Sequence, residues 1–264
     1  STVSSNDLHA VLHILEDWCR TWQLQVNISK TYVLHLGFNN PHLSYTFDNS
    51  KIKPTVSVRD LGVEIDPGLK FDSHINKIVA KAYGRVGTLF RGFTTRNPSI
   101  LRKAYVTYIR PILEYASNVW SPCLKKHINA IEKVQRNFTR RLPVLRGLSY
   151  EERLAVLDLE TLEYRRLKSD LVLYYKIINN LTIWCPSSTF DIITPVRDTR
   201  LTAESAVYIK KPLCRTNMYE NNFFQRCVSC WNSLPGHVVR SDTIKQFNNA
   251  LSCVDLTKFL SVGF

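Results

Sequence analysis

The sequence predicts an α+β fold that is predominantly helical, with short antiparallel strands confined to the first quarter of the chain. Apolar residues recur every three or four positions near the N-terminus and again through residues 73–181, which is the spacing of one helix face. Between these regions lie short valine-rich segments separated by turn residues, which are typical of strands. Hydrophobic residues make up 44% of the 264, enough for a packed core.

An amphipathic helix opens the chain, and several strands follow it. Its apolar face consists of Leu8, Val11, Leu12, Leu15, Trp18 and Trp22. The segments LQVN (24–27), TYVLHLGF (31–38) and VSVRDLGVEID (56–66) favour strands, and the sequences NNP, DNS and DPG supply turns. We therefore expect residues 1–71 to form one helix and a small antiparallel sheet.

Residues 72–181 predict a series of helices. The first would bury a face made of Ile75, Ile78, Val79, Ala82, Val86 and Leu89. The second pattern runs from Pro98 to Trp120 and contains Pro111, which should kink or divide it because proline removes a helical hydrogen bond. Two further patterns cover residues 127–142 and 159–181. The last segment, 182–264, predicts an irregular connector up to about Met218 and then two short helices separated by a Pro-Gly turn at Pro235 and Gly236.

Positive charge is concentrated in the helical middle of the chain. The net charge is +13, and residues 72–181 hold 20 Lys and Arg against 9 Asp and Glu. Three clusters stand out: Lys77, Lys81 and Arg85; Arg136, Arg140 and Arg141; and Arg165 and Arg166 with Lys168. Such clusters favour contacts to nucleic-acid phosphates without sequence choice. The alternative is a set of solvated helix faces whose cations pair with Glu132, Glu151, Glu152 and Glu163.

The search for other sites in the sequence is mostly negative. The chain has no Asp-Asp pair, glycine-rich phosphate loop, HExxH or GxSxG motif. Asp60 and Asp66 could be metal ligands, but turn and capping roles suit them better. CVSC at Cys227–Cys230 is a lone CxxC in an apolar helical stretch, so we expect these cysteines to pack in the core and the chain to bind no metal.

The cysteine content and the lengths of the apolar runs indicate the cellular compartment of the protein. Seven cysteines without a disulfide framework favour a reducing, intracellular compartment. There is no 18-residue apolar run and no signal peptide, so no membrane partner is expected. The chain does not begin with Met, which suggests a piece of a longer protein.

The order of motifs along the chain is more informative than any one of them. LQVNISKTYVLHLG is followed by VSVRDLGVEID, FDSHINKIVAKAYGRVGTLFR, RPILEYASNVWSP, IEKVQRNFTRRL and finally FFQRCVSCWNSLP. This order, over residues 7–251, resembles the C-terminal portion of the reverse transcriptase of jockey-like LINE elements, which are non-LTR retrotransposons. RPILEYASNVWSP together with IEKVQRNFTRRL is especially characteristic of that group.

The resemblance implies part of an RNA-directed DNA polymerase. Residues 1–71 would be the end of the palm, 72–181 the thumb and connecting helices, and 182–264 a connector with C-terminal helices. NISKT matches motif D, which would place Asn27, Lys30 and Thr31 near the incoming nucleotide, with Lys30 stabilising the leaving pyrophosphate. Leu61 and Gly62 would belong to a primer grip, where glycine permits close approach of the backbone.

The same resemblance implies partners and a limit. The thumb would lay Lys77, Lys81 and Arg85 along an RNA template or RNA/DNA duplex, next to the upstream fingers and palm of the same polyprotein, in the nucleus. In the family, paired aspartates hold Mg²⁺, so we expect the complete polymerase to need this ion. Those aspartates are not in this sequence, so we expect this chain alone to be inactive. The alternatives are a non-enzymatic nucleic-acid-binding or interaction module derived from such an element, and a decayed reading frame.

Overall fold

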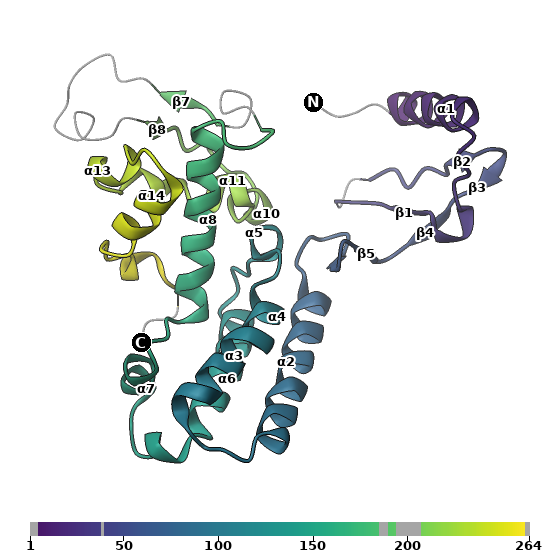
Figure 1. The fold of residues 1–264 in the computed structure, drawn as a ribbon. Helices are drawn as coiled ribbons and strands as arrows, with labels where there is room; N and C mark the ends of the chain where they lie inside the picture. Colours follow the sequence, from purple (N-terminus) through teal and green to yellow (C-terminus); the bar gives the residue numbers. More distant parts are fainter. Residues whose placement is uncertain (1–4, 38–39, 185–189, 194–206, 262–264) are drawn as a thin grey trace. The chain divides into compact units, whose positions relative to one another are not determined.

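The computed structural model describes residues 5–37, 40–184, 190–193 and 207–261, shown in Figure 1. The chain is mostly helical with small sheets, so the predicted α+β class is confirmed. It divides into two compact units, residues 1–74 and residues 75–264, which are described separately.

The first unit begins with a helix, and the way this helix ends explains why the strand predicted over LQVN (24–27) does not form. α1 (Ser5–Thr21) closes in a left-handed residue, Gln23, at φ 53°. The amide of Leu24 donates to the carbonyl of Cys19 at 2.9 Å, and that of Gln23 donates to Arg20 at 3.3 Å, which is the Schellman arrangement. Leu24 therefore belongs to the helix cap, and the strand predicted over LQVN does not form. A single turn of 3₁₀ helix, η1 (Ile28–Lys30), follows instead.

Six short strands complete the first unit. β2 (Thr46–Phe47) pairs with β3 (Ser50–Lys51), and β5 (Val58–Asp60) pairs with β6 (Val63–Ile65), both antiparallel. The prediction of one strand over VSVRDLGVEID is wrong, because a turn at Leu61 and Gly62, both with positive φ, divides it into β5 and β6. β1 (Tyr32–Leu34) pairs with β4 (Lys53–Thr55) in parallel, so the antiparallel prediction is wrong for this pair. Residues 35–52 connect the two strands, and a connection of about a dozen residues or more is what a parallel pair requires.

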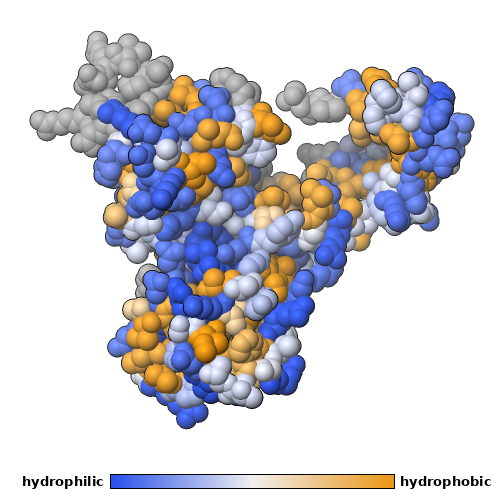
Figure 2. All heavy atoms as spheres, viewed as in Figure 1, coloured by the Kyte–Doolittle hydropathy of each residue, from blue (hydrophilic) through white to orange (hydrophobic). Residues whose placement is uncertain are grey.

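The core of the first unit is small. Cys19, Tyr45, Phe47 and Ile52 are its buried residues. The amide of Asp48 donates to Glu16 Oε1 at 2.7 Å and ties the β2–β3 turn to α1. Much of the predicted apolar face of α1 nevertheless stays exposed, and Figure 2 shows apolar side chains on the visible surface of this region. Within this predicted face, Val11, Trp18 and Trp22 are 55%, 49% and 65% exposed. Ile14, which the prediction did not include, is 68% exposed.

Seven helices form the first part of the second unit, with α2 beginning just before it. They are α2 (Asp72–Gly92), α3 (Pro98–Tyr108), α4 (Arg110–Glu114), α5 (Ser117–Trp120), α6 (Lys125–Arg140), α7 (Tyr150–Leu157) and α8 (Leu162–Ile178). The division predicted at Pro111 is confirmed, because α3 ends at Tyr108 and α4 starts at Arg110. Ala116, at φ 52°, separates α4 from α5.

The C-terminal segment contains more helices than the two predicted. β7 (Ile192–Ile193) pairs antiparallel with β8 (Tyr208–Ile209) in the connector, part of which lies outside the described residues. The helices are α10 (Asn217–Glu220), α11 (Phe223–Arg226), α12 (Val228–Asn232), α13 (Gly236–Val239) and α14 (Ile244–Leu251), followed by the 3₁₀ turn η3 (Thr257–Phe259). Cys227 and Ser233 interrupt the pattern where we expected one helix, and the turn at Pro235 comes where predicted.

α8 is the helix on which the second unit is built. It contacts α4, α5, α6 and α14, and Figure 1 shows it running between the lower helices and the C-terminal ones. On the C-terminal side, Tyr175 stacks on Phe247 with ring centroids 4.4 Å apart. In the lower helices, Tyr105 of α3 stacks on Phe138 of α6, also at 4.4 Å. Such aromatic pairs add to the free energy gained from buried area.

A buried ion pair joins α8 to α5 and α11. Arg226 donates through Nε and Nη2 to both carboxylate oxygens of Asp170, each at 2.9 Å, and through Nη2 to the carbonyl of Asn118 at 2.8 Å. The Asn118 amide also donates to Asp170 Oδ1 at 2.7 Å. The two charged side chains are only 15% and 3% exposed. The carboxylate of Asp170 therefore holds α5 and α11 against α8.

We predict that Asp170→Asn destabilises the protein by about 3–5 kcal/mol, because it leaves the Arg226 charge buried without a counterion. Urea unfolding followed by circular dichroism measures this loss. The matched control is Asp158→Asn, which removes the carboxylate of an exposed pair with Arg102 and should change the free energy of unfolding far less. Equal effects of the two substitutions would contradict the role given to the buried pair.

Candidate nucleic-acid interface

The exposed face of α2 carries the first basic cluster. Ile75, Ala82, Val86 and Leu89 are buried on the opposite face, as the sequence predicted. Lys77, Lys81 and Arg85 are exposed, and successive cations are separated by four residues, or about 6 Å of helix rise. Lys81 and Arg85 have no ion-pair partner among the described residues, so their charges are available to a ligand.

A groove of about 520 Å³ lies beside these cations, between α2 and the α3–α4 segment. Its lining comprises Lys81, Arg85, Thr88, Leu89, Gly92, Phe93, Thr107, Tyr108, Ile109 and Ile112. Tyr108 is the most exposed aromatic residue of this set, at 66%. The groove thus combines two cations with an accessible aromatic ring, which is the combination that single-stranded nucleic acids require. Charge alone indicated Lys81 and Arg85, whereas Tyr108 was missed because its position depends on how α3 packs.

The second basic cluster is only partly available. Arg136 lies over the ring of Tyr150, with its guanidinium carbon 4.7 Å from the ring centroid, and its Nε is buried. Arg141 is exposed and lies 4.2 Å from the ring centroid of Phe90 on α2. Arg140 is exposed and lies near Tyr83 of α2. Burial raises the pKa of Tyr83, and the positive charge of Arg140 acts in the opposite direction. Arg140 and Arg141 therefore extend the positive surface beside α2.

The third basic cluster turns inward. Arg165 forms ion pairs with Glu114 and, at 3.3 Å, with Glu160, and Lys168 pairs with Glu160 at 2.9 Å. Arg166 is 2% exposed, and none of its guanidinium nitrogens has a hydrogen-bond partner in the described part of the chain. Burial lowers the pKa of Arg166, while the surrounding carboxylates, with that of Glu132 first, oppose this effect. As the structure places them, Arg165 and Arg166 do not present a phosphate-binding surface.

The motif D-like residues lie together in one turn of the first unit. The Thr31 hydroxyl donates to the carbonyl of Asn27 at 3.0 Å, and the Ser29 hydroxyl donates to Asn27 Oδ1 at 2.6 Å. Lys30 ends the 3₁₀ turn, is exposed, and has no ion-pair partner in residues 5–37 or the other described ranges. Its ammonium group is therefore free to meet an anion, although nothing in this turn distinguishes it from a surface lysine.

The two residues assigned to a primer grip form the tip of the β5–β6 hairpin. Leu61 and Gly62 have φ of 44° and 89°, which is the pattern of a type I′ turn. Leu61 is 83% exposed although leucine is disfavoured in this conformation. Asp66 has the turn role expected of it, since its carboxylate accepts from the amides of Gly68 at 3.0 Å and Phe71 at 2.7 Å.

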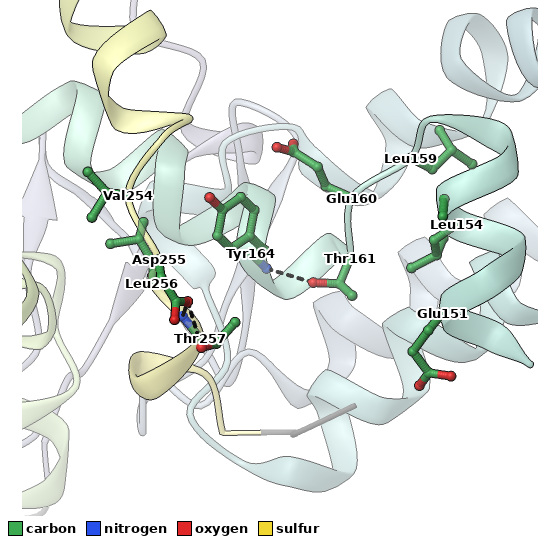
Figure 3. A pocket seen from close by; sticks show the side chains of 11 residues that line it. Glu151, Leu154, Leu159, Glu160, Thr161, Tyr164, Val254, Asp255, Leu256 and Thr257 are labelled. Carbon is green, nitrogen blue, oxygen red and sulfur yellow. Dashed lines mark hydrogen bonds between the residues drawn. The ribbon is translucent and has the colours of Figure 1, made fainter.

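A second pocket, of about 360 Å³, has the opposite charge. Figure 3 shows it between α7, the start of α8 and residues 254–257, with Glu151, Glu160 and Asp255 among its lining residues. Burial, with the charges of Glu160 and Asp255, raises the pKa of Tyr164 in its wall. These carboxylates would repel a polyphosphate, so this pocket does not belong to the candidate nucleic-acid interface.

The cysteines of the CxxC motif lie in the core, as the sequence suggested. Cys227 and Cys230 are each 1% exposed and pack with Trp231 and Phe247. Burial raises the pKa of Cys230 to about 12 and raises that of Cys227 as well. Among the described residues, no three His, Cys, Asp or Glu side chains converge in a way that could hold a metal ion.

Comparison with known proteins gives one distant relative. An uncharacterized protein of Caenorhabditis elegans is 29% identical over 125 residues, which cover 46% of this chain and 63% of that protein. No family model matches the chain, and no solved structure matches it. Within the described segments, no helix is both long enough and apolar enough to cross a bilayer.

We predict that Leu61→Asn stabilises the β5–β6 hairpin by up to about 1 kcal/mol, because asparagine tolerates a positive φ better than leucine. Hydrogen exchange of the backbone amides measures this stabilisation, and exchange in β5 and β6 should become slower. Gly62→Ala is the opposing control and should accelerate exchange, since it places a Cβ at φ 89°. Faster exchange in Leu61→Asn would show that contacts of the leucine side chain outweigh the strain.

We predict that native Cys227 and Cys230 react far more slowly with iodoacetamide than exposed Cys123 and Cys253. Burial raises the pKa of Cys230 to about 12, so at pH 8 it is almost entirely the thiol, and reaction requires the thiolate. The rate at the buried pair should rise with pH and on unfolding in urea. Peptide mapping by mass spectrometry identifies the labelled residues, and equal native rates would contradict the assigned burial.

Proposed function

We propose that this protein binds nucleic acid through the exposed face of α2, with Arg140 and Arg141 of the α6 end beside it. The observation that carries the proposal is the row of Lys77, Lys81 and Arg85 on a helix whose other face is buried. Because that buried face holds the helix in place, the spacing of these cations is set before nucleic acid binds. The spacing of about 6 Å suits successive phosphates of a polynucleotide strand.

The expected mode of binding is electrostatic. Contacts from lysine and arginine to phosphates give affinity without sequence preference and weaken steeply as salt is added. The ion pairs of Arg165 and Lys168 reduce the number of cations available, so the interface is smaller than the sequence charge suggests. We therefore expect moderate affinity at low salt and weak affinity at physiological salt.

The wider proposal is that the chain is the C-terminal part of a non-LTR retrotransposon reverse transcriptase. The order of its sequence motifs supports it, as does a mostly helical chain whose first unit contains one helix followed by short strands. In a complete enzyme acting in the nucleus, α2 would hold the template and primer, Lys30 would face the leaving pyrophosphate, and the Leu61–Gly62 turn would approach the primer. The paired aspartates that would hold Mg²⁺ in the complete enzyme are not in this sequence, so the proposal assigns no catalysis to this chain alone.

A second candidate function is a non-enzymatic interaction module derived from such an element. The exposed apolar residues of α1 favour it, because exposed apolar patches often mark contact surfaces. The genomic neighbourhood separates the two candidates. An upstream frame encoding a Tyr/Phe-x-Asp-Asp hairpin favours the polymerase, whereas an independent promoter and start codon favour the module.

We predict that Lys81→Gln combined with Arg85→Gln weakens binding to a duplex oligonucleotide and lowers the slope of log affinity against log salt by about 1.5. Fluorescence anisotropy of a labelled RNA/DNA hybrid, at several salt concentrations, measures both quantities. The loss follows from removing two phosphate contacts on α2.

The matched control is Lys245→Gln combined with Arg215→Gln, which removes the same charge from exposed positions on α14 and before α10. The slope should then change little. An equal fall in both double variants would mean that net charge, rather than the α2 surface, governs binding. Binding that does not respond to salt would count against the proposal.

A further inference from the structure

We infer that the groove between α2 and the α3–α4 segment seats an unpaired nucleotide, so that the interface prefers single-stranded nucleic acid to a duplex. This rests on the proposed function, because it assumes that the α2 cations bind phosphates. It adds a ligand class and a residue, Tyr108, that charge does not indicate.

The polar side of the groove fits a phosphodiester. Lys81 and Arg85 both line it, one helical turn apart, and neither has an ion-pair partner in the described part of the chain. A groove that accepted an apolar peptide would gain nothing from these two charges, whereas a polyanion would neutralise both.

The opposite wall fits a base. Tyr108 is 66% exposed, and its hydroxyl has no hydrogen-bond partner among the residues described. Phe93 and Ile112 continue the apolar wall, and Thr107 adds a hydroxyl that could meet a base edge. Bases stack on aromatic side chains in a sequence-tolerant way, since every base has a π-face. Inorganic phosphate alone would leave this wall unused.

The size of the groove and the stacking of bases in a duplex both favour binding of a single-stranded nucleotide over a duplex. A volume of about 520 Å³ is in the range of small-ligand sites, roughly 300–1,000 Å³, and suits one nucleotide. In a duplex the faces of the bases are stacked on one another and cannot reach Tyr108 without unstacking. A duplex can therefore use the cations but not the aromatic wall.

The test compares Tyr108→Ala with the unchanged protein on two labelled probes, a ten-nucleotide oligouridine and a blunt RNA/DNA hybrid. We expect the substitution to weaken oligouridine binding about tenfold and hybrid binding less than about twofold. Tyr108→Trp should restore oligouridine binding, because it keeps the stacking surface. Tyr219→Ala, at a 45% exposed position on α10, is the control and should alter neither affinity.

A direct readout is photo-crosslinking of an oligonucleotide that contains 5-iodouridine, with the crosslinked peptide expected to contain Tyr108. If hybrid and oligouridine bind with the usual salt dependence but Tyr108→Ala affects both equally or neither, the inferred seat is wrong and the proposed function stands. If the unchanged protein binds neither probe at low salt, the proposed function fails as well.

Discussion

The ion pair of Asp170 and Arg226 sets the arrangement of the second unit. Its carboxylate accepts from Arg226, from the amide of Asn118 and, at 3.6 Å, from the thiol of Cys227, so two separate segments, α5 and residues 226–227, converge on one side chain of α8. A charge buried without partners would be very costly, which means that these segments have few alternative positions. The short helices α11 and α12, which have little stability alone, therefore take their place from α8.

A second buried network fixes the other end of α8. Glu132 of α6 accepts from the Tyr150 hydroxyl and, at 2.9 Å, from the amide of Leu162 at the start of α8. Gln135 donates to Tyr150 and to the carbonyl of Glu160, each at 3.0 Å. Burial raises the pKa of Glu132, and the positive charges around it, with Arg166 first, act in the opposite direction. The positive charge of α8 therefore has a structural use.

These two networks explain why the excess of positive charge is not one continuous surface. Arg165 of α8 pairs with Glu114 of α4, and Lys168 pairs with Glu160 just before α8. α2 buries its apolar face, and its Lys81 and Arg85 have no ion-pair partner among the described residues. The proposed interface depends on this difference, because a cation that is already paired with a carboxylate binds a phosphate less readily. Tyr108, the last residue of α3, lines the same groove as Arg85.

The sequence by itself determined the helical class, the amphipathic faces of α1 and α2, the break near Pro111 and the exposed row on α2, because each follows from periodicity or from the chemistry of one residue. Only the tertiary structure decided that Arg165 and Arg166 turn inward, that β1 and β4 run parallel, and that Tyr108 lines the same groove as Lys81. A charge pattern along one helix gives the spacing of its cations. It cannot show which neighbouring helix will supply the carboxylate that neutralises them.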